Sequence, residues 1–156
     1  MRKYPEPEHF TPRYTEKYKG SLPIVARSSW EMKAFRFLDL NPNVLKWGSE
    51  SVVVLYQDPT RPDPYTGKPS VHRYFIDLNM TMKDKFGKLH TYLVEIKPES
   101  QYLKPVQGKK KSKTFLNESV LWIRNVKKWE AATKFAKSKG WEFIILTEKE
   151  IGPLNY

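Results

Sequence analysis

Two strand-like segments joined by a short turn constrain the fold of this chain more than any other feature of its sequence. Residues 72–80 (HRYFIDLNM) and 89–97 (LHTYLVEIK) are rich in the β-branched and aromatic residues that favour strands. The intervening KDKFGK contains a glycine, as do many turns that close antiparallel hairpins. We therefore predict a hairpin, and a turn centred near Lys85 and Phe86 places residues opposite each other when their numbers sum to about 172.

This register brings two carboxylates face to face. Asp77 lies opposite Glu95, and side-chain alternation puts Lys97 on the same face of its strand as Glu95. Like charges opposite each other in a sheet destabilise it by roughly 0.2 to 1 kcal/mol, and burial adds to this, unless a cation or a proton lies between them. We interpret the pair as part of a site for a divalent metal ion.

The short triplet Glu95-x-Lys97 has little meaning by itself. A chain with 17 acidic residues and many lysines contains about two acid-x-Lys triplets by chance, and this chain has two, beginning at Glu31 and Glu95. Only the second lies in an apolar strand that is paired with another acid. This context favours a functional site over a chance match.

Composition narrows the chemistry and the setting. The length of 156 residues suits one domain, and 39% hydrophobic residues are typical of a globular protein. The absence of cysteine and the presence of only three histidines point to oxygen ligands, which suit magnesium or manganese. The longest apolar runs, VVVLY and FIILT, are too short to span a bilayer, and the first ten residues lack the apolar segment of a signal peptide. We expect a soluble, intracellular protein without a membrane partner.

The basic charge is concentrated directly after the predicted site. The net charge is +11, and residues 98–140 contain eleven basic residues against three acidic ones, a net charge of +8. Such a segment favours binding to nucleic acid, although charge runs also occur on merely solvated faces. The predicted phosphate-binding residues are Lys104, Lys109, Lys110, Lys111 and Lys113.

The remaining segments predict an α/β fold in the order helix, three strands, helix, strand, with a central mixed sheet flanked by helices. We expect an extended N-terminal arm over 1–23 and a single domain over 24–156 with a basic loop at 98–116. The expected elements are a helix from a Ser28 cap to Leu40, a first strand at 47–56, an irregular proline-rich loop at 58–70, the hairpin at 72–97, a second helix from Asn117 or Ser119 to Lys139, and a last strand at 141–147. The helix before the last strand favours a parallel, right-handed crossover.

Two further acids are candidates for the site. Glu31 falls within the apolar arc of the first helix that should face the sheet, and it also stands three residues after Ser28, where it could complete a capping box. Glu50 lies on the first predicted strand, where a polar residue is also ordinary. Both alternatives stay open at this point.

The residues above resemble those of a known family. The chain resembles the PD-(D/E)xK nuclease superfamily, and within it the TnsA-type endonucleases and the small head-completion nucleases of T-even-type tailed phages. The similarity covers about residues 28–97, is strongest in RSSWEMKAF, NPNVLKWGSE, HRYFIDLNM and YLVEIKP, and continues in the order of elements to Thr147. Ile76 departs from the pattern, because these nucleases usually have proline before the aspartate.

The resemblance implies a restriction-endonuclease-like fold and a specific set of site residues. The implied catalytic residues are Glu31, Asp77, Glu95 and Lys97. On this basis Asp77, Glu95 and the Ile96 carbonyl would bind Mg²⁺ or Mn²⁺ with support from Glu31, and Glu50 is a possible additional acid. The implied partner is double-stranded DNA, and the implied activity is hydrolysis of its phosphodiester bonds with little sequence specificity.

Three functional hypotheses follow from the resemblance and the charge. The first is an endonuclease that acts on packaged DNA during head maturation and head–tail joining, in the host cytoplasm or on the virion. The others are a non-catalytic DNA-end-binding protein of the phage head and a junction-resolving nuclease. The N-terminal arm is a candidate contact for phage head or neck proteins.

Overall fold

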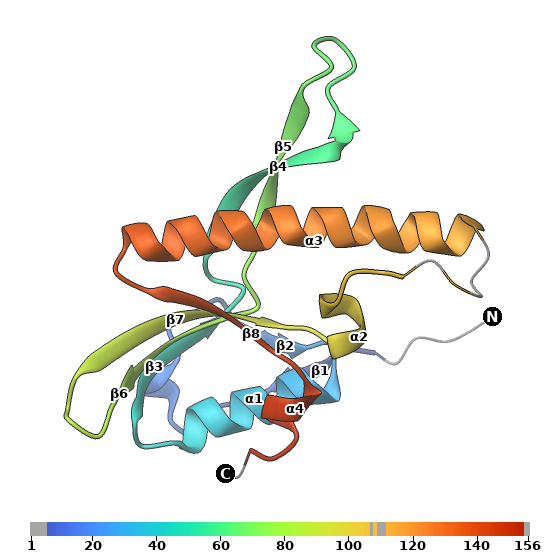
Figure 1. Ribbon diagram of the computed structural model, residues 1–156. Coiled ribbons are helices and arrows are strands. Elements are labelled where there is room, and N and C mark those ends of the chain that lie inside the picture. The colour runs from blue at the N-terminus through green and yellow to red at the C-terminus, as the bar shows by residue number, and fades with distance from the viewer. Residues whose placement is uncertain (1–5, 107, 109–111, 155–156) are drawn as a thin grey trace.

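The computed structural model describes residues 6–106, 108 and 112–154. Its layers are shown in Figure 1. The elements are β1 (Glu8–Phe10), a 3-10 helix η1 (Thr15–Lys17), β2 (Ile24–Ala26), α1 (Ser29–Leu40), β3 (Val44–Ser49), β4 (Val53–Pro62), β5 (Pro69–Phe75), β6 (Leu78–Lys83), β7 (Leu89–Ile96), α2 (Glu99–Tyr102), α3 (Ser112–Ser138), β8 (Glu142–Leu146) and α4 (Glu148–Ile151).

The centre of the fold is a four-stranded mixed sheet. Its strand order is β3-β6-β7-β8, with β8 parallel to β7 and the other neighbours antiparallel. Val94 of β7 packs with α1 in one apolar cluster, whereas its neighbour Leu93 packs with α3 in a second. Because adjacent strand residues point to opposite faces, the two helices cover opposite faces of the sheet. The predicted mixed α/β fold and the parallel crossover are confirmed.

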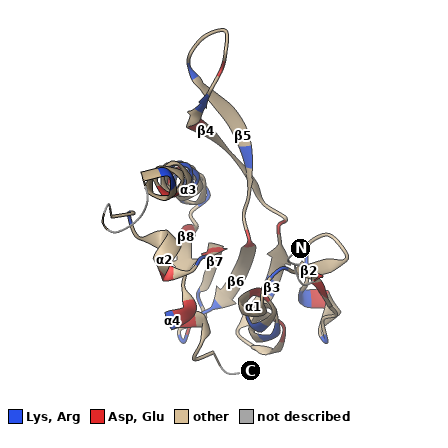
Figure 2. Ribbon diagram, turned by 90° about the vertical axis from the view of Figure 1, so that its right-hand side faces the viewer, with Lys and Arg blue, Asp and Glu red and all other residues tan. Residues whose placement is uncertain are grey.

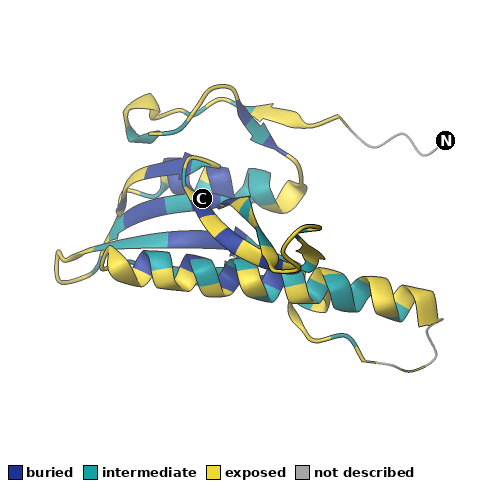
Figure 3. Ribbon diagram, turned by 90° about the horizontal axis from the view of Figure 1, so that it is seen from above, coloured by how far each residue is buried: buried dark blue, intermediate teal, exposed yellow. Residues whose placement is uncertain are grey.

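Burial follows this layered arrangement. Figure 3 shows that the buried residues concentrate on the sheet and on the part of α3 that lies over it. The buried residues of α3 all fall in its second half, from Asn125 to Ala136. No helix among the described residues is both long enough and apolar enough to cross a membrane.

The register of the β6–β7 hairpin agrees with the prediction. Leu78 pairs with Val94, and Lys83 pairs with Leu89, so opposite residues have the expected sum. The predicted strand at 72–80, however, is interrupted at Ile76 and Asp77, which separate β5 from β6. Asp77 therefore lies just beyond the ladder, opposite Glu95 if the register is continued by one pair.

A second hairpin corrects two predictions. The expected strand at 47–56 is divided into β3 and β4, and the expected loop at 58–70 is largely the far end of a β4–β5 ribbon that projects past α3 (Figure 1). Its prolines are tolerated because both strands of a two-stranded ribbon are edge strands. The turn is stabilised by the Asp63 carboxylate, which accepts hydrogen bonds from the N–H groups of Tyr65 and Thr66 at 2.8 and 2.9 Å.

The region predicted as a basic loop is partly helical. Glu99–Tyr102 forms α2, and α3 is already helical at Ser112, before the predicted caps at Asn117 and Ser119. Ser119 lies inside the helix, where its hydroxyl donates to the carbonyl of Phe115 at 2.8 Å. Lys113 consequently belongs to the first turn of α3, and the predicted positions Lys109–Lys111 lie outside the described residues.

The described part of the N-terminal segment lies against the domain. Glu8–Phe10 pairs with β2, and Phe10 packs between Phe35 and Trp47 of the first apolar cluster. The buried Asp39 of α1 accepts hydrogen bonds from the backbone N–H groups of Arg13 and Tyr14 at 2.8 and 3.0 Å. Phe10 of this segment thus contributes to the core, while the proposed division of the segment from the domain at residue 23 stays a prediction.

Candidate active site

The predicted carboxylates, Asp77 and Glu95, lie where β6 begins and β7 ends. Asp77 follows the break after β5, and its Oδ2 atom accepts a hydrogen bond from the backbone N–H of Ile96 at 2.8 Å. Glu95 lies one residue earlier on β7 and is only 7% exposed. The break in the strand therefore turns Asp77 toward the end of β7, where the chain backbone holds it.

Burial disfavours the charge of both carboxylates, and Glu95 adds to this effect at Asp77. Burial, reinforced by the neighbouring Glu95, raises the pKa of Asp77 to about 7. Burial also raises the pKa of Glu95, although Tyr74 and Lys97 act in the opposite direction. Such shifts, which arise from burial together with a specific charged neighbour, are frequent at functional sites.

The side chains of Tyr74 and Lys97 hold the Glu95 carboxylate. The Tyr74 hydroxyl on β5 donates a hydrogen bond to Glu95 Oε2, and Lys97 Nζ lies 3.8 Å from Glu95 Oε1. Burial and the nearby Glu95 raise the pKa of Tyr74, which keeps its hydroxyl protonated and able to donate. Glu95 and Lys97 are therefore brought together as the sequence predicts.

The backbone at Glu50 is strained, and hydrogen bonds connect it to the segment that carries Asp77. Glu50 has a φ of +51°, in the left-handed region that non-glycine residues seldom occupy. Its N–H donates to the carbonyl of Asp77 at 3.1 Å, and the N–H of Ile76 donates to the carbonyl of Val52 at 3.0 Å. The break between β3 and β4 thus lies against the break between β5 and β6, and local strain of this kind is often found at functional sites.

Glu31 reaches the site from α1. Burial raises its pKa and Asp77 adds to this effect, whereas the hydrogen bond from the Arg27 N–H lowers it. The N-cap is confirmed, because Ser28 Oγ accepts from the Glu31 N–H at 3.1 Å. The Glu31 carboxylate, however, accepts from the N–H of Arg27 at 2.7 Å. A capping box would require the Glu31 carboxylate to accept a hydrogen bond from the Ser28 N–H, but it accepts from the Arg27 N–H instead. The capping-box alternative for Glu31 is therefore corrected.

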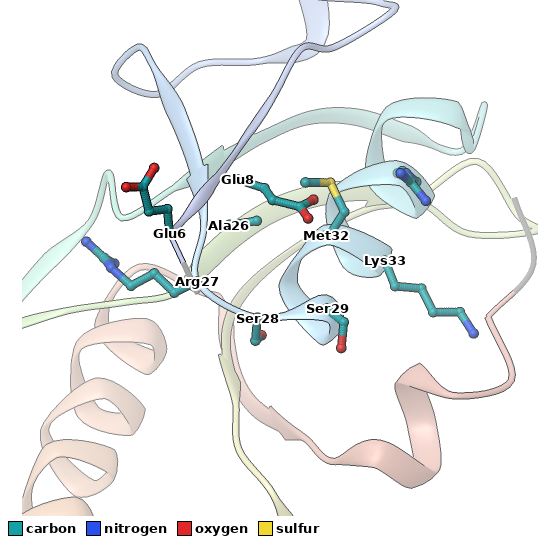
Figure 4. A pocket seen from close by; sticks show the side chains of 9 residues that line it. Glu6, Glu8, Ala26, Arg27, Ser28, Ser29, Met32 and Lys33 are labelled. Carbon is teal, nitrogen blue, oxygen red and sulfur yellow. The ribbon is translucent and has the colours of Figure 1, made fainter. Parts of the chain in front are cut away.

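Arg27 links the acidic residues on this side. Its guanidinium forms an ion pair with Glu50, and Glu31 and Asp77 also contribute to raising the pKa of Arg27. Arg27 borders a hollow of about 460 Å³ at the start of α1, shown in Figure 4, where Glu6, Glu8 and Lys33 also contribute to the lining. The Asp77–Glu95 pair does not line this hollow, so the hollow flanks the site and is not its centre.

Of the predicted DNA-binding lysines, Lys104 and Lys113 lie within the described residues. Lys104 Nζ lies 5.8 Å from the ring centroid of Trp122, and both Lys104 and Lys113 are exposed to solvent. The role of these two lysines in DNA binding stays a prediction. Three residues absent from the predicted site, Tyr74, Arg27 and Lys128, are instead placed near it by the fold.

Sequence patterns contain little that could have identified these three residues. Regular alternation from Asp77 would place Tyr74 on the opposite face of a continuous strand, and only the break at Ile76 and Asp77 brings both side chains to Glu95. Lys128 is one of many lysines on a long helix. Arg27 lies directly before Ser28, the N-cap of α1, and no local sequence pattern indicates which residue its side chain would contact.

Comparisons with known proteins agree with the class that the fold and the acid–lysine constellation define, a nuclease with a restriction-endonuclease-like fold. A family model described as "TnsA-like endonuclease N terminal" matches residues 41–148. The chain therefore belongs to the TnsA-like endonuclease family. It is also 34% identical over 154 residues to a protein named "Head completion nuclease" from Enterobacteria phage T4, with 94% of each chain covered. These similarities support a nuclease role.

The residues at the site suit the divalent metal ion that the superfamily resemblance implies. Among the described residues, no three or more His, Asp or Glu side chains already form a metal-binding cluster. The chemistry of the Asp77–Glu95 pair nevertheless fits a hard cation, because two mostly buried carboxylates with raised pKa values gain from a positive charge between them. Glu31 lies within the electrostatic reach of Asp77 and adds a third carboxylate.

Proposed function

We propose that this protein is a metal-dependent DNA endonuclease whose catalytic residues are Asp77, Glu95, Lys97 and Glu31. The single observation that carries the proposal is the pair of carboxylates held face to face beside Lys97. This arrangement costs free energy in the protein alone. The membership of the chain in the TnsA-like endonuclease family supports the same reading.

The metal would be held by Asp77, Glu95 and the Ile96 carbonyl, with Glu31 as a supporting acid and Glu50 as an additional candidate. Mg²⁺ or Mn²⁺ bound there would supply Lewis-acid activation of a phosphodiester and of a water molecule. The Ile96 N–H orients Asp77, and the Tyr74 hydroxyl orients Glu95, so both carboxylates are fixed before a ligand arrives.

Lys97 would act on the substrate side of this pair. Its ammonium group lies 3.8 Å from Glu95 and is partly exposed. From this position it would orient the attacking water and offset the negative charge that develops on the phosphoryl oxygens in the transition state. Asp77 and Glu95 would thus hold the metal, and Lys97 would act on the water and the phosphoryl group.

We further propose that cleavage depends on DNA structure or ends more than on sequence. Contacts from basic side chains to phosphates position DNA without reading bases, and they make affinity fall as salt increases. Lys104, Lys113 and the stretch Lys109–Lys111 remain candidates for such contacts. By analogy with the phage T4 relative, the cellular role would be nuclease action in head completion, in the host cytoplasm or on the virion, with head or neck proteins as partners.

The test is cleavage of supercoiled, linear and branched DNA with Mg²⁺ by the parent protein, Asp77→Ala and Lys97→Ala. Lys88→Ala removes a lysine from the turn between β6 and β7 and serves as the control. We expect the two site variants to lose activity by at least about 100-fold, and the control to retain it. Equal cleavage by all four proteins would refute the assignment, and paired cuts only in branched DNA would point to junction resolution.

A further inference from the structure

Lys128 of α3 occupies an unusual environment for a lysine. Its side chain is partly buried, and Nζ lies 5.7 Å from the ring centroid of Tyr56 and 5.6 Å from that of Tyr74. Both rings belong to the β4–β5 hairpin, and Tyr74 also donates to Glu95. Burial lowers the pKa of Lys128, while Glu95 opposes this effect. Lys128 therefore connects α3, the hairpin and the carboxylate pair.

The hairpin is fixed to α3 by the fully buried Asp58. Its Oδ2 atom lies 2.6 Å from Arg61 Nε and 3.1 Å from Arg124 Nε, and Arg124 Nε also donates to the Thr60 hydroxyl at 2.7 Å. Although burial opposes the change, hydrogen bonds from Thr60 and Arg61 lower the pKa of Asp58 to about 2, so this carboxylate is ionised. Its charge is engaged by the two arginines.

Positive charge is left in excess around Lys128. Lys97, Arg61 and Arg124 each act electrostatically on Lys128, and Glu95 is the acid that acts on it most strongly. Four cations thus gather with two buried acids, Asp58 and Glu95. Arg124 and Lys128 are four residues apart on one helix face, where like charges destabilise a helix. The folded protein alone gains little from this arrangement, whereas an anion would be stabilised by it.

The basic residues continue along the space between α3 and the hairpin. A hollow of about 460 Å³ there is lined by Tyr56, Lys127 and Lys134, together with Glu130, which pairs with Lys127 at 3.5 Å. Figure 2 looks along α3 and shows the helix beside the hairpin, with basic positions on both. Arg61 and Arg124 keep 43% and 32% of their side chains exposed, so a ligand can reach them.

We infer that Arg61, Arg124 and Lys128 form a phosphate-binding cluster between α3 and the β4–β5 hairpin that holds a DNA backbone beside Glu95 and Lys97. The occupant is a polyanion, because the cluster combines several cations with few free acids, and the carboxylate pair next to it suits phosphodiester chemistry. The inference rests on the proposed nuclease function, and it names α3 and the hairpin as the main substrate contact, distinct from the predicted basic stretch at Lys104–Lys113.

The test measures binding without cleavage, in an Asp77→Asn background, by fluorescence anisotropy of a short labelled DNA duplex over a range of salt concentrations. Adding Lys128→Gln should weaken binding by about three- to tenfold near 0.1 M salt and reduce the salt slope by about one. Adding Lys88→Gln, which removes one lysine at the opposite end of the β6–β7 hairpin, should change the slope much less. Lys128→Arg, which keeps the positive charge, should restore the affinity and the salt slope.

The inference is overturned if Lys128→Gln and Lys88→Gln give the same affinity and slope while thermal unfolding shows that both proteins are folded. It is also overturned if polyglutamate binds in a Lys128-dependent manner and the duplex does not, because the cluster would then suit an acidic protein. Lys128-dependent binding without cleavage by the parent protein would refute only the nuclease function. Normal cleavage with unaltered binding in Lys128→Gln would refute only the phosphate-binding cluster.

Discussion

The two flanks of the Asp77–Glu95 pair differ in charge. Toward α1, the acids Glu31 and Glu50 gather around a single arginine, Arg27. Toward α3 and the β4–β5 hairpin, Lys97 and Lys128 lie within reach of Glu95. The carboxylate pair thus lies at a boundary between negative and positive groups. This arrangement suits a reaction in which a metal cation and a phosphate anion must meet.

The flanks also differ in how they are supported. The acidic flank depends on backbone features, namely the left-handed Glu50 and the hydrogen bonds between the two strand breaks. The basic flank depends on side chains, since Tyr74 donates to Glu95 and Asp58 binds arginines from two elements. We expect substitutions on the basic flank to change the orientation of Glu95 and the binding of the substrate. We expect substitutions of the carboxylates to change metal binding.

The largest effect that we expect from a residue outside the catalytic set is that of Tyr74→Phe. The substitution removes one hydroxyl and leaves the buried Glu95 without its hydrogen-bond donor, so the carboxylate loses its fixed orientation. We expect cleavage to fall by about 10- to 100-fold, with a higher Mg²⁺ concentration needed for half-maximal rate. Tyr92→Phe, on β7, is the matched control. An unchanged Mg²⁺ dependence in Tyr74→Phe would contradict the positioning role.

A smaller effect is expected on stability, where Asp77→Asn should stabilise the metal-free protein. The folded-state pKa of Asp77 is raised to about 7 from an ordinary value of 3.8, so its ionised form costs free energy. That cost is fully present above pH 7, decreases as the pH falls through 7 and disappears below about 4. We expect Asp77→Asn to gain about 1 to 2 kcal/mol at pH 8, or about 2 to 8 °C in Tm.

The measurement is thermal unfolding with EDTA at a series of pH values between 4 and 8. The difference between Asp77→Asn and the parent should shrink toward acidic pH, because the parent then binds its own proton. A difference of constant size across this range would show that charge repulsion at Asp77 does not cause it.

Much of the central sheet and of the carboxylate pair could be predicted from the sequence. The β6–β7 hairpin has an alternating apolar pattern and a short turn, and these two features determine a register that the structure confirms. The Ser28 cap and the parallel β8 also follow from local rules. Each of these predictions concerns neighbours in sequence or a single crossover, where local chemistry decides the outcome.

The β4–β5 hairpin and the basic flank could not be predicted in the same way. The prolines in residues 58–70 favour an irregular loop, and the ribbon forms because α3 supplies Arg124, 66 residues later in the chain, to Asp58. Tyr74 reaches Glu95 only through the strand break before β6. Lys128 approaches the pair from a helix whose sequence shows only a basic surface. These contacts depend on the packing of distant elements.

The most direct measurement of the central claim is calorimetric titration of Mn²⁺ into the parent protein, Asp77→Asn and the control Lys88→Gln, without DNA. The account predicts that the parent and the control bind Mn²⁺ equally, and that Asp77→Asn loses this binding while remaining folded. Equal Mn²⁺ binding by all three proteins would contradict the claim that Asp77 and Glu95 form the metal centre.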